Sequence, residues 1–136
     1  MVITYTKATE EKIMAVLEDI FKDEFDSSIY TGPYQNLETE SIQIKFEIPA
    51  SEKLSGTTFF LERRFFIEIR LYTEDGMEDL EKFLSNRSDR IYQLLNNNIT
   101  NSTNWYNLNI VEQYFPEDEL PPGVLFSISL DNYTKL

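Results

Sequence analysis

The segment 58–72 alternates between two kinds of side chain over most of its length, and this pattern restricts the fold more than any other feature of the sequence. Alternation with a period of two is typical of a β-strand that buries one face and leaves the other uncovered. The predicted inner face carries Phe65, Ile67, Ile69 and Leu71, and the predicted outer face carries Phe66, Glu68, Arg70 and Tyr72. Because strands usually run for about five or six residues, we expect this one to extend beyond the core.

The segment 41–48 shows the same alternation shortly before the long strand. Its apolar positions share one face: Ile42, Ile44, Phe46 and Ile48. Pro49 is predicted to end this strand, because proline has no N–H to donate to a ladder. The polar segment 50–57 is predicted to be a loop. We therefore expect an antiparallel hairpin whose loop end lies outside the core.

Two segments have the spacing of amphipathic helices. The first covers 9–25, where Thr9 is a favourable N-cap residue. Its apolar positions recur on one face: Ile13, Leu17, Ile20 and Phe21. The second helix begins at Met77 and fades into the Asn-rich segment 96–104, which is predicted to be a loop. Between the first helix and the first strand, the segment 26–40 is polar and predicted to be irregular.

The last third of the chain predicts a second hairpin. A third strand is expected at 105–115, followed by an acidic turn at 116–123 that contains three prolines. Apolar residues then alternate along the last strand: Val124, Phe126, Ile128 and Leu130. The sequence thus predicts one α+β domain over residues 1–136, in the order α-β-β-α-β-β. We expect a four-stranded, mostly antiparallel sheet of two hairpins, with both helices packed on one face.

The residue types argue against catalysis. The chain contains no Cys and no His, which removes the thiolate nucleophile and the side chain that titrates nearest neutral pH. The usual phosphate-binding, nucleophile-elbow and zinc-protease motifs are absent from the sequence. The acidic run 23–26 lacks the spacing of a calcium loop, and the run 117–119 is interpreted as the solvated tip of a hairpin turn. We therefore expect a protein that is not an enzyme and that binds no cofactor or metal.

The formal net charge of −12 restricts the partners. Such a surface repels nucleic-acid phosphates and anionic membranes, because both attract basic side chains. No segment of the sequence has the length and apolarity of a membrane span. An acidic surface favours solubility, contact with a basic protein, or a conduit through which DNA passes without adhering.

The uncovered sheet face is the predicted interface with another subunit or protein. Exposed aromatic side chains among charges are typical of such a surface. The candidate interface residues are Arg63, Arg64, Phe66, Glu68, Arg70 and Tyr72. The pair Arg63–Arg64 has two interpretations: either this part of the hairpin extends into solvent, or one arginine pairs with a carboxylate of a neighbouring subunit. If the surface is a subunit contact, Arg70→Glu should weaken assembly and leave the monomer folded.

Several segments follow one another in a pattern that resembles a known family. An alternating strand at 65–72 is followed by a Leu-rich helix at 77–83 and 90–92, and the chain ends on an alternating strand at 125–130. This organisation is similar to that of the tail terminator proteins of long-tailed bacteriophages, over about residues 9–133. The resemblance implies a structural virion protein, made in the host cytoplasm. It would form a hexameric ring of identical subunits that caps the tail tube and joins it to the head-completion or neck proteins.

The resemblance also implies that DNA passes through the ring and is not bound specifically. A second hypothesis is a small acidic cytosolic module that acts on a basic protein partner, such as an immunity, chaperone-like or DNA-mimicking protein. The two hypotheses differ in self-association, since the first requires a closed ring and the second a monomer or dimer. A third is an enzyme that uses carboxylates or tyrosine, which would need a pocket with a strongly perturbed carboxylate.

Overall fold

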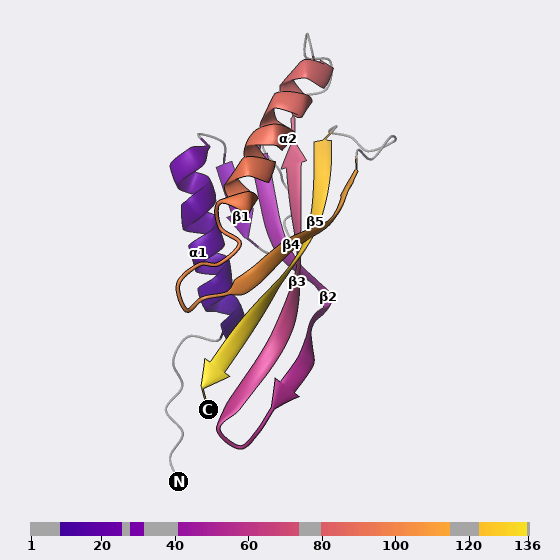
Figure 1. The fold of residues 1–136 in the computed structure, drawn as a ribbon. Helices are drawn as coiled ribbons and strands as arrows, with labels where there is room; N and C mark the ends of the chain where they lie inside the picture. The colour runs from indigo at the N-terminus through magenta and orange to yellow at the C-terminus, as the bar shows by residue number, and fades with distance from the viewer. Residues whose placement is uncertain (1–8, 26–27, 32–40, 74–79, 115–122, 136) are drawn as a thin grey trace.

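The computed structural model describes residues 9–25, 28–31, 41–73, 80–114 and 123–135. These residues form two helices and five strands, with the helices lying on the same side of the sheet (Figure 1). The elements in chain order are α1 (Thr9–Glu24), β1 (Ser28–Thr31), β2 (Ser41–Gly56), β3 (Phe60–Tyr72), α2 (Leu80–Asn96), β4 (Tyr106–Tyr114) and β5 (Gly123–Lys135).

The five strands form one mixed sheet in the order β1-β2-β3-β5-β4. β1 runs parallel to β2, whereas the other three pairs are antiparallel. β3 lies at the centre and pairs with β5 from Phe60↔Lys135 to Tyr72↔Gly123, so the strand with the clearest alternation has neighbours on both sides. The predicted α+β class is confirmed, and the four-stranded sheet is wrong because a fifth strand is present.

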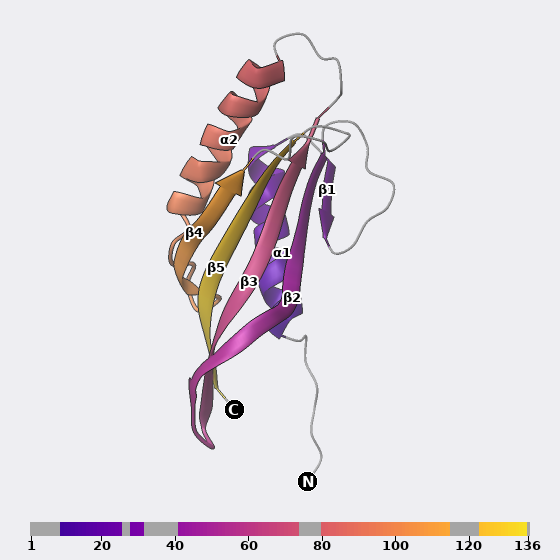
Figure 2. The same cartoon turned by 90° about the vertical axis from the view of Figure 1, so that its right-hand side faces the viewer.

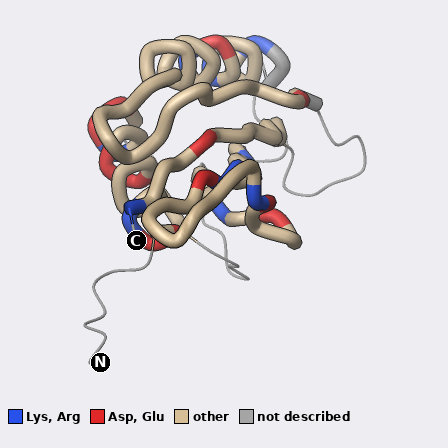
Figure 3. Tube along the Cα trace, turned by 60° about the horizontal axis from the view of Figure 1, so that its bottom comes forward, with Lys and Arg blue, Asp and Glu red and all other residues tan. Residues whose placement is uncertain are grey.

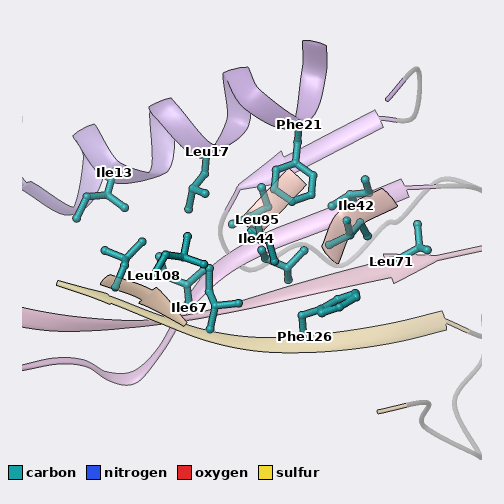
Figure 4. Close-up of a cluster of buried hydrophobic side chains, with 14 of the residues drawn as sticks. Ile13, Leu17, Phe21, Ile42, Ile44, Ile67, Leu71, Leu95, Leu108 and Phe126 are labelled. Carbon is teal, nitrogen blue, oxygen red and sulfur yellow. The ribbon is translucent and has the colours of Figure 1, made fainter. Parts of the chain in front are cut away.

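The core lies between the helices and one face of the sheet (Figure 4). α1 contributes Ile13, Leu17 and Phe21, spaced four residues apart, so that all three point to the same side of the helix. The buried residues of α2 are Leu84, Ile91 and Leu95. The central strands contribute alternate residues from the same face: Ile42, Ile44, Phe65, Ile67, Ile69, Leu71, Val124, Phe126, Ile128 and Leu130. The predicted faces of α1 and β3 are confirmed. Ile48 is an exception to the predicted face of β2, since it is fully exposed where the pairing with β3 is interrupted.

The missed strand, β1, occupies the start of the segment predicted to be irregular. It pairs in parallel with β2 from Ser28↔Ser41 to Thr31↔Ile44. Its four residues are too few to show an alternation, and only Ile29 packs against the core. Its position is set by contacts with α1 and β2, which the local sequence does not encode. The rest of that segment, 26–27 and 32–40, lies outside the described residues.

β2 does not end at Pro49, and the predicted loop at 50–57 is wrong up to Gly56. The strand continues after an irregularity, since Phe46 pairs with Ile67 and Ser51 with Phe65. Four residues, 47–50, therefore face the single residue between those partners. Proline is compatible with a strand at such a bulge, because the ladder is already interrupted there.

Beyond this bulge the β2–β3 hairpin extends past the N-terminal end of α1, together with the end of β5 (Figures 1 and 2). The expected hairpin with its loop end outside the core is thus confirmed. The Phe60 ring stacks on the Tyr133 ring with centroids 5.1 Å apart, which ties the hairpin to β5. Phe59, at the turn, is 76% exposed.

Two other boundaries differ from the prediction. β5 continues five residues beyond Leu130, the last of its alternating apolar positions, because β3 offers it a partner as far as Phe60. The helix predicted from Met77 is described from Leu80 onward. The predicted acidic turn lies outside the described residues up to 122.

Gly123 is a position at which a larger residue is expected to destabilise the fold. A Cβ at Gly123 would lie 1.9 Å from the Leu71 carbonyl oxygen, a backbone atom that cannot rotate away. We expect Gly123→Ala to lower the free energy of unfolding by about 2 kcal/mol, because β5 must shift against β3. Urea denaturation followed by circular dichroism measures this change. The matched control is Gly56→Ala in the exposed hairpin, where the nearest atom is the movable end of Lys53; equal costs at the two glycines would contradict the prediction.

Candidate interface

One face of the sheet points away from both helices, and we call it the open face. Basic and acidic positions are interspersed along the strands (Figure 3). The open face includes alternate residues of the three central strands: Gln43, Lys45, Arg64, Phe66, Glu68, Arg70, Tyr72, Ser127, Ser129 and Asp131. It therefore brings together five of the six predicted interface residues, although Tyr72, expected to be an exposed aromatic, is buried at 8% exposure.

Arg63 is the predicted interface residue that the structure places elsewhere. Its side chain lies on the opposite face, with the guanidinium carbon 5.0 Å from the centre of the Phe65 ring. Arg63 Nη2 also donates a hydrogen bond of 3.3 Å to Thr134 Oγ1. Adjacent strand residues must point to opposite faces. The six residues therefore cannot form a single continuous contact surface.

Arg64 forms the best-defined ion pair of the open face. Its Nε donates to Asp131 Oδ1 at 2.8 Å, and its Nη2 donates to Asp131 Oδ2 at 3.3 Å. The side chain of Asp131 is only 5% exposed and also accepts a hydrogen bond of 3.0 Å from Asn107 Nδ2. This contact raises the pKa of Arg64 further above its ordinary value. Arg64 therefore pairs with a carboxylate of its own chain. The alternative, an arginine that pairs with a carboxylate of a neighbouring subunit, is not needed to explain Arg64.

Arg70 is also held within its own subunit. Its Nη2 lies 3.5 Å from Glu68 Oε1, which Lys45 Nζ approaches to 3.8 Å from β2. The Arg70 guanidinium lies over the Tyr72 ring at 5.7 Å. The variant Arg70→Glu would place a second carboxylate beside Glu68 and remove the cation–π contact. It would therefore destabilise the monomer as well as any assembly, so it is a poor probe of assembly alone.

Tyr106, on β4 beside the Arg64 ion pair, is expected to titrate at unusually high pH. Burial of its hydroxyl, followed by its hydrogen bond to Glu62, raises the pKa of Tyr106 from 10.0 to about 12. In the unfolded chain this hydroxyl ionises near its ordinary pKa. The stabilisation is therefore fully present below about pH 10 and is lost as the pH rises towards 12.

The free energy of unfolding, measured from pH 9 to 12 for the wild type and Tyr106→Phe, tests this titration. We expect the wild type to lose stability more steeply above pH 10 than the variant, which lacks the ionisable hydroxyl. Comparing the two proteins cancels the contributions of the other tyrosines and the lysines. Identical slopes in the two proteins would show that Tyr106 ionises normally in the folded state.

The described residues contain no group of three or more acidic side chains placed to hold a metal ion. In the acidic run at the end of α1, Glu24 instead pairs with Arg90 of α2, with Nη2 and Oε1 2.6 Å apart. The same Arg90 nitrogen donates to the Glu24 carbonyl oxygen at 2.9 Å. Asp26 and the second acidic run lie outside the described residues. Neither described helix is long and apolar enough to cross a membrane.

The hairpin end is a second candidate interface that the sequence prediction did not include. Three of its side chains are large, apolar in character and accessible: Phe59 is 76% exposed, Tyr133 52% and Leu54 37%. Phe59 has the same parity as the inner-face residue Phe65, but the core ends before this position. This interface could have been predicted from the expected length of the hairpin, because apolar residues beyond the core have no helix to cover them.

No protein-family model matches this chain, and no curated protein sequence matches it significantly. The fold and its surfaces define a class on their own: an α+β domain with an open sheet face and an extended hairpin that carries exposed aromatic residues.

Proposed function

We propose that this chain is a structural assembly protein that forms a closed ring and acts as a tail terminator of a long-tailed bacteriophage. In this role the ring caps the tail tube and joins it to the head-completion or neck proteins. The observation that carries the proposal is the hairpin beyond the core with its exposed Phe59. Exposed large apolar side chains that gather in one place are typical of protein contacts.

The edges of the sheet support assembly of this kind. β1 pairs with β2 only as far as Ile44, so the outer edge of β2 from Lys45 to Gly56 has no neighbouring strand among the described residues. β4 forms the opposite edge of the sheet. Free edges readily accept another chain. A subunit whose contact surfaces differ from each other associates head to tail, and such contacts close into a ring when the rotation between subunits permits it.

The net charge of −12 is compatible with a ring around DNA. Acidic side chains repel the phosphate backbone, so the DNA can move through the lumen without adhering to it. In this proposal Phe66 and the ion-paired side chains around it form a further contact surface for a neighbouring subunit or the tail tube. The chain itself carries no catalytic role.

A small acidic module that binds a basic protein is the second candidate function. The observation that favours it is the same net charge, together with the exposed Glu10 and Glu11 at the start of α1. Such a module would act as a monomer or dimer and would not associate with tail tubes.

Electron microscopy of tail tubes tests the proposed function. The probe is tail tubes polymerised from the tube protein of the phage that encodes this chain, with and without the purified protein. We expect the protein to add ring-shaped density at one end of each tube and to stop further growth, giving tubes of limited length. Tubes of the same length in both samples, with bare ends, would overturn the proposal.

A further inference from the structure

A groove runs along the exposed side of α1, where the helix meets β2. Its volume is about 390 Å³, which is within the size range of binding pockets. Apolar side chains contribute part of its lining: Met14, Ala15 and Phe46. Three carboxylates of α1 also line it, Glu10, Glu11 and Glu18, together with Thr31 of β1. We call this feature the α1 groove.

The carboxylates make the α1 groove electronegative. Glu18 is partly neutralised by Lys22, whose Nζ lies 2.7 Å from Glu18 Oε1. Glu10 and Glu11 are exposed and form no ion pair with any described residue. The groove therefore combines an apolar lining with acidic side chains whose charge no described residue neutralises, and it fits a protein segment that is both apolar and basic.

The end of the β2–β3 hairpin has this chemistry. Its exposed apolar side chains are Leu54, Phe59 and Tyr133. Two basic residues accompany them: Lys53 on β2, and Lys135, which pairs with Phe60 across the β3–β5 ladder. Both lysines are exposed and form no ion pair with the described residues. The segment 53–60 contains no acidic residue, although the chain as a whole is strongly acidic. We call these five residues the hairpin tip.

We propose that the hairpin tip of one copy of this chain binds in the α1 groove of the next copy. The apolar side chains of the tip would contact Met14 and Phe46. Lys53 lies on the Arg63 face of the hairpin and Lys135 on the opposite face. The tip would therefore enter the groove end-on, and the two lysines would approach Glu10 and Glu11 from two sides. The occupant is a second copy because the hairpin of the same chain extends past the N-terminal end of α1, away from its own groove (Figures 1 and 2). This inference rests on the proposed function, since it names the contact that joins neighbouring subunits.

The contact is heterologous, because the tip and the groove are different surfaces of the subunit. Each copy then offers one tip and one groove, so the association continues from copy to copy until a ring closes. The charged pairs lie at the rim of an apolar contact, where they select the partner and its orientation more than they add affinity.

Charge reversal on each side tests the contact. The tip variant carries Lys53→Glu and Lys135→Glu, and the groove variant carries Glu10→Lys and Glu11→Lys. Sedimentation velocity over a concentration series measures self-association of each purified protein. We expect each variant to associate about tenfold more weakly than the wild type, since two exposed pairs are replaced by like charges. Circular dichroism should stay unchanged in both variants, because all four positions are exposed. The thermal midpoint should stay unchanged in the tip variant and fall in the groove variant, because lysines replace two carboxylates in the first turn of α1. Association is therefore measured well below the midpoint of the groove variant.

The groove variant also distinguishes loss of the tip–groove contact from a change in the overall charge repulsion between subunits. It makes this acidic protein less acidic, so repulsion between whole subunits falls and would by itself favour association. Lys82→Glu on α2, an exposed lysine outside both surfaces, is the control for the tip variant and should associate like the wild type.

Mixing the two variants gives the decisive result. The reversed tip of one variant complements the reversed groove of the other, and the unchanged tip and groove also match, so alternating copies should regain wild-type association. If the wild type assembles but the variants assemble equally well, or if mixing restores nothing, the proposed contact is wrong and the ring proposal stands. If the wild type remains monomeric at every concentration, the proposed function itself fails.

Discussion

Phe126→Ala is expected to lower the free energy of unfolding by about 3–5 kcal/mol. Phe126 lies on β5 opposite Ile69 and is fully buried beneath the helices. Its ring meets the Tyr92 ring of α2 edge-on, with centroids 6.3 Å apart. Truncation removes this contact and leaves a cavity between the sheet and α2, which the surrounding strands cannot close. Urea denaturation followed by circular dichroism measures the loss.

The same substitution at Phe59 provides the matched control. Phe59 is 76% exposed at the end of the hairpin, so Phe59→Ala should change the free energy of unfolding by less than about 0.5 kcal/mol. The two variants separate the phenylalanine that holds the fold from the one assigned here to assembly. Similar losses in both variants would contradict the position of the core, and so would a negligible loss for Phe126→Ala.

Trp105→Ala is expected to cost a similar amount, about 3–5 kcal/mol. Trp105 is almost completely buried, and its Nε1 donates a hydrogen bond of 2.7 Å to the Asn98 carbonyl oxygen. The variant loses the buried ring and leaves that carbonyl without its donor. Because this is the only tryptophan of the chain, unfolding is followed by circular dichroism in place of fluorescence.

Trp105→Phe divides the effect into two parts. Phenylalanine keeps much of the apolar contact but cannot donate the hydrogen bond, so we expect a smaller loss of about 1–3 kcal/mol. If Trp105→Phe is as unstable as Trp105→Ala, the hydrogen bond accounts for the whole effect. If Trp105→Ala unfolds at the same urea concentration as the wild type, the ring is not buried in solution.

The residues around Trp105 show what composition could not predict. The Asn-rich segment 96–104 was predicted to be a loop, and the structure forms an ordered series of side-chain hydrogen bonds there. Asn98 Nδ2 donates to the Leu94 carbonyl oxygen at 2.8 Å, Asn101 Nδ2 to Asn98 Oδ1 at 3.2 Å, and Asn104 Nδ2 to Asn101 Oδ1 at 2.9 Å. Asparagine is common in loops, so composition predicts a loop here. The hydrogen bonds between Asn98, Asn101 and Asn104 form only after the backbone has turned, which brings residues three positions apart close together.

Periodicity predicted the helices and strands whose own sequence carries enough apolar residues to define a buried face. α1 and β3 match their predicted positions closely, because each has enough apolar residues on one face to define its period. β1 and the second half of β2 were missed because their positions depend on neighbouring strands. A four-residue edge strand and a strand that resumes after a bulge give no periodic signal of their own.

For the candidate interface, the sequence could predict which side chains share a face but not which of them pair with each other. Alternation alone placed Phe66, Glu68, Arg70 and Tyr72 on one face, and the β3–β5 register agrees with this. The pairing of Arg64 with Asp131 could not be predicted, because the two residues are 67 positions apart and meet only when that register is known. Arg63 follows the same parity rule, since it must face the side opposite to Arg64.

The mass of the purified protein in solution tests the central claim, self-assembly into a ring, most directly. Light scattering over a concentration series at low and high salt measures this mass against the 16.1 kDa of one chain. The account predicts a discrete species close to six times that mass, which persists on dilution until the ring dissociates. A mass of 16.1 kDa at every concentration and salt would contradict it, and would favour an acidic module that acts as a monomer on a basic partner.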